Sequence, residues 1–176
     1  TAGQARFGND PDRFARLWQG AAAALRSLPG DAVIGVAPHS LRAVSREGLV
    51  MATDLAPKAP IQLHLAEQLA EVEELKASYG ARPTEWLLAN APVDDRWCLI
   101  HATQMEPAET IALARTGAVA GLCPITEANL GDGIFDGARY LAAGGRFGVG
   151  SDSNVRISLS EELRLLEYSQ RLRDRG

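Results

Sequence analysis

Apolar and polar residues alternate between residues 60 and 65, where Gln62 and His64 separate three branched apolar residues. This period of two is typical of a β-strand and places both polar side chains on one face. From residue 66 the spacing changes to that of a helix, with leucine and valine inward and Glu71 among the outward positions. His64 therefore closes a strand and Glu67 opens the connection to a helix. Barrel-type α/β folds place their chemistry at this end of a strand.

The same succession of strand and helix runs along the chain. We predict further strands at residues 31–37, 97–102, 118–123 and 146–150. We predict helices at residues 11–28, 46–55, 66–79, 83–88 and 107–116, with a short one ending at residue 143. Pro107 near the start of one helix and Gly117 just past its end fit the usual asymmetry of helix termini.

The segment after the strand at 118–123 is polar over residues 124–133, and we expect it to be a long connection. A connection of this length is more often functional than accidental. A closing helix follows, for which Ser158 and Glu161 have the spacing of a capping box. Its predicted inward residues are Leu163, Leu166 and Tyr168.

Five strand-then-helix units without a hairpin signal indicate a parallel sheet. An open doubly wound sheet and part of a (β/α)8 barrel both have this pattern. A doubly wound nucleotide-binding fold normally carries a glycine-rich phosphate turn after its first strand, and residues 35–39 do not form one. Polar residues instead end nearly every strand, as around the mouth of a barrel. A whole barrel takes about 250 residues, so we predict a partial (β/α)8 barrel, about strands 4 to 8.

Composition narrows the class of partner. The chain has 176 residues, of which 46% are hydrophobic and 23% charged, with a formal net charge of -4. No basic stripe is interleaved with aromatic residues, which argues against nucleic acid, and no run approaches the roughly 18 apolar residues of a membrane span. The first residues resemble no signal peptide. We therefore predict a cytoplasmic protein that acts on a small molecule, in which Cys98 and Cys123 are buried, reduced thiols.

Four side chains at strand ends suggest a metal hydrolase: His64, Glu67, His101 and Asp152. Catalytic zinc prefers nitrogen and oxygen ligands and lowers the pKa of its bound water to about 7. His64 would be a ligand, and Asp152 would both bind the metal and accept a proton. Glu67 would carry protons to a leaving amine, and His101 would stabilise the electrophile. Taken singly, Asp152 is equally well explained as a helix N-cap, and His101 as a packed histidine held by the backbone.

Several motifs resemble those of the amidohydrolase superfamily and, within it, the formimidoylglutamate deiminases of bacterial histidine degradation. The general signals of the deaminase-like branch are the His-x-x-Glu at residues 64–67 and the Ser-Asp at 151–152. The narrower signals are Pro-His-Ser-Leu-Arg at 38–42 and Thr-Glu-Ala-Asn-Leu-Gly-Asp-Gly at 126–133. The resemblance covers nearly the whole chain.

The resemblance implies a role for each matching position. It makes His64 a metal ligand, Glu67 the proton shuttle, His101 the histidine beside the bound water, and Asp152 the metal-binding aspartate of the eighth strand. It also makes His39 and Arg42 a substrate-binding pair and implies one zinc ion. A guanidinium suits that role because it grips a carboxylate with two parallel hydrogen bonds, although a surface arginine at a helix start would look the same.

One departure from the family pattern is serious. The family takes two further metal ligands from a His-x-His motif, whereas His39, His64 and His101 are the chain's three histidines and none is so spaced. The chain also starts without methionine. We therefore expect residues 1–176 to be an interior part of the catalytic barrel domain, lacking the first three strands and the flanking domain. Alone it is expected to be inactive and, with exposed strand edges, to form a homo-oligomer.

The leading functional hypothesis is hydrolysis of the formimino group of N-formimino-L-glutamate in the full-length enzyme. A neighbouring hypothesis keeps the mechanism and changes the substrate to an aromatic amine such as guanine or cytosine. Arg42 with His39 argues against a neutral heterocycle. A third hypothesis is that the chain is a catalytically silent α/β fragment.

Overall fold

A parallel sheet of four strands organises the computed structural model, which describes residues 8–175. The strands are β1 (Ile61–Leu65), β2 (Trp97–His101), β3 (Val119–Leu122) and β4 (Arg146–Val149). They lie side by side in chain order, and each pairs in parallel with the next. All four carboxyl ends therefore meet at one edge of the sheet, as the sequence predicts for consecutive strand-then-helix units.

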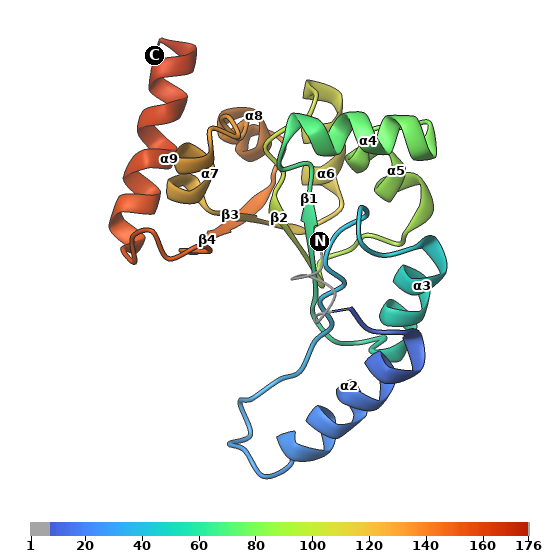
Figure 1. The fold of residues 1–176 in the computed structure, drawn as a ribbon. Coiled ribbons are helices and arrows are strands. Elements are labelled where there is room, and N and C mark those ends of the chain that lie inside the picture. The colour runs from blue at the N-terminus through green and yellow to red at the C-terminus, as the bar shows by residue number, and fades with distance from the viewer. Residues whose placement is uncertain (1–7, 176) are drawn as a thin grey trace.

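The helices connect and flank these strands. They are α2 (Pro11–Leu25), α3 (Arg46–Leu55), α4 (Leu69–Tyr79), α5 (Pro83–Asn90), α6 (Pro107–Arg115), α7 (Pro124–Leu130), α8 (Gly137–Ala142) and α9 (Leu159–Asp174). Figure 1 shows α4, α5, α6 and α8 gathered on one side of the sheet, with α2 and α3 near one end and α9 near the other. None of the helices within residues 8–175 is both long enough and apolar enough to cross a membrane.

The two faces of the sheet differ in burial. Along β1 the residues with odd numbers, such as Leu63, are buried in the apolar core, whereas Gln62 is exposed and His64 is half-buried. The core continues through Trp97 to Tyr140, whose hydroxyl donates a hydrogen bond to a backbone carbonyl of the strand region. The face opposite the helices therefore carries the polar residues, which leaves His64 accessible at the end of its strand.

The predicted strand at residues 31–37 is replaced by two isolated parallel bridges, Val36 to Ile61 and Ser40 to His64. The backbone N–H of Val36 donates to Pro60, and that of Gln62 donates to Val36. The next bond of a parallel ladder would need an N–H from Pro38, which proline lacks. The strand prediction was wrong because this missing donor interrupts the ladder.

The segment at 124–133 is not an extended connection, because its first seven residues form α7. Pro124 occupies the first turn, where a missing N–H costs nothing. Gly131 ends the helix with φ of 75°, a left-handed conformation that glycine adopts without strain. A glycine-ended helix thus occupies the predicted loop.

Three further predictions about helices were wrong in whole or in part. Glu71, assigned to the outward face of α4, is fully buried. In α9 the buried residue is Glu162, whereas Leu163 and Tyr168 are exposed, and Leu166 packs against the core as predicted. The capping box is also absent: the Ser158 side chain makes no cap bond, and the Glu161 carboxylate pairs with Arg156 instead.

Candidate active site

His64 is the second-last residue of β1 and has a defined ring orientation. Its Nδ1 lies 2.8 Å from the backbone oxygen of His39. A carbonyl oxygen only accepts hydrogen bonds, so Nδ1 carries the hydrogen and a neutral ring keeps Nε2 as its free lone pair. The ring of His39 lies 4.8 Å away between centroids. This is the usual arrangement of a ligating histidine, whose second nitrogen is held by a protein oxygen.

Glu67 follows β1 in a loop that another carboxylate holds. Ala66 has φ of 49°, so the chain leaves the extended conformation directly after the strand. The two carboxylate oxygens of buried Glu71 accept the backbone N–H groups of Ala66 and Glu67, at 3.2 and 2.8 Å. Glu71 thereby fixes the backbone that presents Glu67.

His101 ends β2, next to β1. Register pairs it with Leu65, and its ring stacks on that of His64 with centroids 5.6 Å apart. Its Nε2 lies 3.7 Å from Oε1 of Glu67, and its Nδ1 lies 3.2 Å from Oε1 of Glu127. The ring therefore lies between the carboxylates of Glu67 and Glu127. The hydrogen-bond partner of Nδ1 is the side chain of Glu127, whereas the explanation of His101 as a packed histidine had a backbone group in that place.

Asp152, His39 and His64 line one cavity. The cavity has a volume of about 370 Å³, and its lining includes His39, His64, Cys123 and Asp152. Asp152 is exposed, has φ of 41° and lies in a turn after β4, whereas the N-cap of the next helix, α9, is Ser158. The N-cap explanation of Asp152 is therefore wrong. The structure brings the strand-end residues of β1 and β4 to a common space.

Arg42 lies beside Glu67, with 3.9 Å between the guanidinium and the carboxylate. It precedes α3, whose first residue is Arg46, so it is not a helix-start arginine. A third of its side chain remains exposed. All six residues predicted for the site thus form one continuous group: His39, Arg42, His64, Glu67, His101 and Asp152.

Burial and charge shift three pKa values in this group. Burial raises the pKa of Glu67 above its ordinary value, even though His101 and Arg42 act in the opposite direction. Burial lowers the pKa of His39, helped by the positive charge that His64 and Arg42 can carry. For His101 burial acts to lower the pKa, but the hydrogen bond to Glu127 and the surrounding carboxylates outweigh it and raise the pKa. A carboxyl that protonates readily beside a basic imidazole is suited to proton transfer.

The donor set fits a metal in part. His64 offers a free Nε2 and Asp152 an exposed carboxylate on the same cavity, whereas a catalytic zinc takes three protein ligands. A second group, His101, Cys123 and Glu127, has ligand atoms within 4.8 Å of one another. Burial raises the pKa of the Cys123 thiol to about 12, so it stays protonated and is a poor ligand. The cavity group is the better candidate for metal binding.

Sequence reasoning missed the side chains that hold the site from behind. Glu71 and Glu127 were not assigned to it, and neither was Asp132, whose carboxylate accepts a hydrogen bond from Gln68. Asp132 and Glu127 lie in the polar segment at residues 124–133, whose length had already indicated a functional role for that region. Glu127 binds His101, 26 residues away in sequence, and Asp132 binds Gln68, 64 residues away, and no spacing rule reaches that far.

A parallel α/β sheet with histidines and carboxylates at successive strand ends is typical of the (β/α)8 barrel fold class. The model of the amidohydrolase family matches residues 6–175. The chain belongs to the amidohydrolase family.

Known relatives agree with this membership. The chain is 52% identical to the formimidoylglutamate deiminase of Pseudomonas aeruginosa, over 98% of this chain and 38% of that protein. It is 30% identical to 5-methylthioadenosine/S-adenosylhomocysteine deaminase 2 of Archaeoglobus fulgidus, over 92% of this chain and 39% of that protein. The chain thus spans about two fifths of the curated relatives it matches.

Solved structures show the same fold. An amidohydrolase from Brucella melitensis matches with a TM-score of 0.97 and 57% identity, over 100% of this chain and 39% of that one. An adenosine deaminase from Xanthomonas campestris with bound zinc matches with a TM-score of 0.79 and 25% identity, over 90% of this chain and 38% of that one. The four-stranded sheet is therefore part of the barrel fold of this family.

Proposed function

We propose that the full-length protein containing this chain hydrolyses the formimino group of N-formimino-L-glutamate, giving N-formyl-L-glutamate and ammonia. The observation that carries the proposal is the guanidinium of Arg42 placed 3.9 Å from Glu67. It sets a binding group for a substrate carboxylate directly beside a carboxyl suited to proton transfer. The likeness to the Pseudomonas deiminase, at 52% identity, supports the same substrate.

Each site residue has a proposed step. Arg42 and His39 bind the carboxylate end of the substrate and orient the formimino carbon. Asp152 takes up the proton of the attacking water, and His101 stabilises the charge that develops as water adds. Glu67 carries protons to the nitrogen, which leaves as ammonia when the carbon–nitrogen bond breaks, so water adds and ammonia is lost in balance.

His64 and Asp152 would hold a divalent zinc ion, together with ligands from outside the described residues. The ion, when bound, supplies a water of lowered pKa and polarises the substrate. Zinc in the similar Xanthomonas adenosine deaminase supports this choice of metal. We further propose that residues 1–176 are one part of a larger catalytic barrel domain, which completes the ligand set.

Glu67→Gln in the full-length enzyme tests the assignment. The amide occupies the same space but cannot shuttle protons, so turnover should fall by about 10²–10⁴-fold while the zinc content stays at the wild-type value. Glu74→Gln, at an exposed position of α4, is the matched control and should keep normal turnover. A near-normal rate for Glu67→Gln contradicts the role of Glu67.

The substrate is tested separately by comparing kcat/KM on formiminoglutamate and on guanine. Arg42 beside Glu67 predicts activity on the charged substrate. Turnover of guanine alone would reject the proposed substrate and keep the mechanism. Metal analysis of the purified 176-residue chain tests the silent-fragment hypothesis, which expects no tightly bound metal in that sample.

A further inference from the structure

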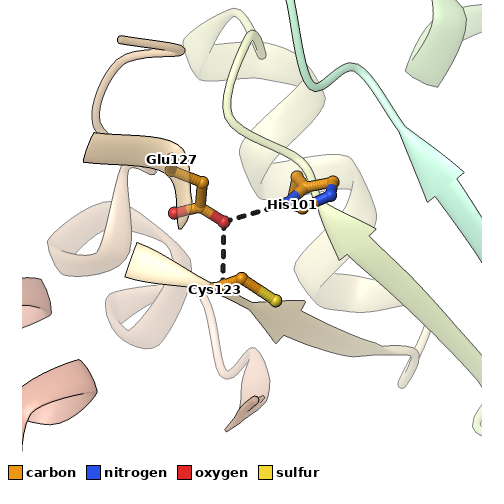
Figure 2. A group of neighbouring side chains, drawn as sticks. All are labelled: His101, Cys123 and Glu127. Atoms are coloured by element: carbon orange, nitrogen blue, oxygen red, sulfur yellow. Dashed lines mark hydrogen bonds and ion pairs between the residues drawn. The ribbon is translucent and has the colours of Figure 1, made fainter. Parts of the chain in front are cut away.

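Glu127 is a buried carboxylate that the proposed reaction does not use. Its side chain is 4% exposed, and its Oε1 accepts the backbone N–H of Cys123 at 2.9 Å. The same oxygen lies 3.2 Å from Nδ1 of His101. Figure 2 shows this oxygen between the His101 ring and the backbone of Cys123, whose sulfur points away from it. A buried charge persists only with hydrogen-bond partners, and the ring is one of them.

The geometry determines which ring nitrogen carries hydrogen. A carboxylate oxygen accepts and does not donate, so the contact at 3.2 Å requires a hydrogen on Nδ1 of His101. In the neutral ring this leaves Nε2 bare, on the side where Glu67 lies 3.7 Å away. The orientation of this ring therefore depends on a residue outside the cavity.

The backbone at His101 makes such a tether necessary. His101 and Ala102 have φ of 70° and 50°, so the regular alternation of side chains along β2 ends at His101. Non-glycine residues in this conformation are strained and need support from their surroundings. A side chain that leaves the pleat here is not oriented by the strand.

The helix that carries Glu127 is itself fixed at two points. The backbone N–H of Ile125 donates to the carboxylate of buried Glu162 on α9, at 2.9 Å. The hydroxyls of Thr126 and Ser153 lie 2.8 Å apart, which links α7 to the turn that contains Asp152. α7 therefore presents Glu127 from a rigid position.

We propose that Glu127 is a positioning residue, which holds His101 in its Nδ1–H form with Nε2 presented to Glu67. This deepens the proposed function, because it rests on the role given there to His101. The alternative, in which Glu127 and His101 share a metal with Cys123, is disfavoured because burial raises the pKa of the Cys123 thiol to about 12, so that the thiol stays protonated.

The tautomer is measured directly by long-range proton–nitrogen NMR of the histidine rings. The sample is the full-length, metal-loaded protein with labelled histidine, in buffer alkaline enough to keep the rings neutral, and His101→Asn assigns the resonance. We expect a protonated Nδ1 and an unprotonated Nε2. The opposite tautomer in the wild-type protein would overturn the proposal.

Variants then test dependence on Glu127. Glu127→Met removes the acceptor at similar size, so the tautomer preference should disappear and kcat on formiminoglutamate should fall about 10- to 100-fold, with KM within about twofold. Glu127→Gln keeps a neutral acceptor and should give intermediate values. Glu162→Gln is the control, because it changes another buried carboxylate but leaves an amide oxygen that can accept the backbone N–H of Ile125. His101 should keep the wild-type tautomer in this variant.

Each outcome separates the two proposals. An unchanged His101 tautomer in both Glu127 variants would overturn the positioning role whatever the substrate. If Glu127→Met fails to fold, the wild-type tautomer and Glu127→Gln decide. A wild-type protein inactive on formiminoglutamate but with the expected tautomer would reject the proposed substrate and leave the role of Glu127 in place.

Discussion

Glu71→Gln should loosen the loop that presents Glu67. The wild-type carboxylate is fully buried and accepts two backbone N–H groups, from Ala66 at 3.2 Å and from Glu67 at 2.8 Å. Glutamine has the same shape but only one oxygen, so one N–H would face an NH₂ group that cannot accept. The strained φ of 49° at Ala66 would then lose part of its support.

The size of the effect follows from the bond that is lost. A hydrogen bond to a charged group contributes about 1.5–3 kcal/mol, and we take about 2 kcal/mol for the bond removed. That energy is about a 30-fold increase in the local opening equilibrium, since 1.36 kcal/mol is a factor of ten. The effect is confined to the loop, so a local probe is better suited than global unfolding.

Amide hydrogen exchange read by mass spectrometry, on a peptide covering residues 64–70 of the full-length protein, measures this opening. Exchange should become about 30-fold faster, and kcat should fall because Glu67 is less well placed. Glu73→Gln is the control: its exposed side chain pairs with Lys76, at 3.4 Å, and such pairs contribute about 0.2–0.5 kcal/mol. Equal exchange and equal kcat in the two variants would refute the reasoning.

Two further predictions concern Arg42 and Glu162. Arg42→Lys replaces a bidentate donor with a point charge, so the substrate loses one charge-assisted hydrogen bond of about 1.5–3 kcal/mol. KM for formiminoglutamate should therefore rise roughly 10- to 150-fold. A KM that is unchanged, and equal to that of the control Arg46→Lys, would show that Arg42 is a surface residue without a role in binding. Burial raises the pKa of Glu162 above 4.5, so the folded protein binds this proton more tightly than the unfolded chain and stability is lost as pH rises from about 4.5. Glu162→Gln should therefore show a smaller loss of thermal stability than wild type between about pH 5 and pH 7, and parallel profiles would contradict this.

The strand-end residues were predictable because strand period and chain direction determine where they meet. His64 and His101 were each placed at the end of an apolar strand, and the parallel sheet brings those ends together. Asp152 was found in the same way, after β4. What decides these positions is local, a run of four to six residues, and the sequence displays it directly.

The first predicted strand shows where local pattern is insufficient. Residues 31–37 have the apolar character of a buried strand, but pairing also depends on a donor at Pro38, two residues beyond the bridge at Val36. Apolar periodicity predicts which face of a strand is buried, but it does not predict whether each backbone N–H has a hydrogen-bond partner. Where the hydrogen-bond ladder decides the structure, a pattern of hydrophobicity alone gives the wrong element.

The buried glutamates were missed for a related reason. Among residues 8–175 the buried glutamates are Glu71, Glu109, Glu127 and Glu162. Each accepts at least one backbone N–H close to a strand end or a helix start, as Glu71 does at Ala66 and Glu162 at Ile125. Helix starts and left-handed strand ends leave N–H groups without ladder partners, and a carboxylate satisfies them strongly.

A pattern analysis assigns glutamate to the solvent face of a helix because an isolated charge is costly to bury. In this fold the cost is offset by the backbone donors that the strand ends expose. The same carboxylates also hold the residues that we propose for catalysis: Glu71 binds the backbone of Glu67, and Glu127 binds the ring of His101. The geometry of the site therefore rests on charged residues whose sequence context makes them resemble ordinary surface positions.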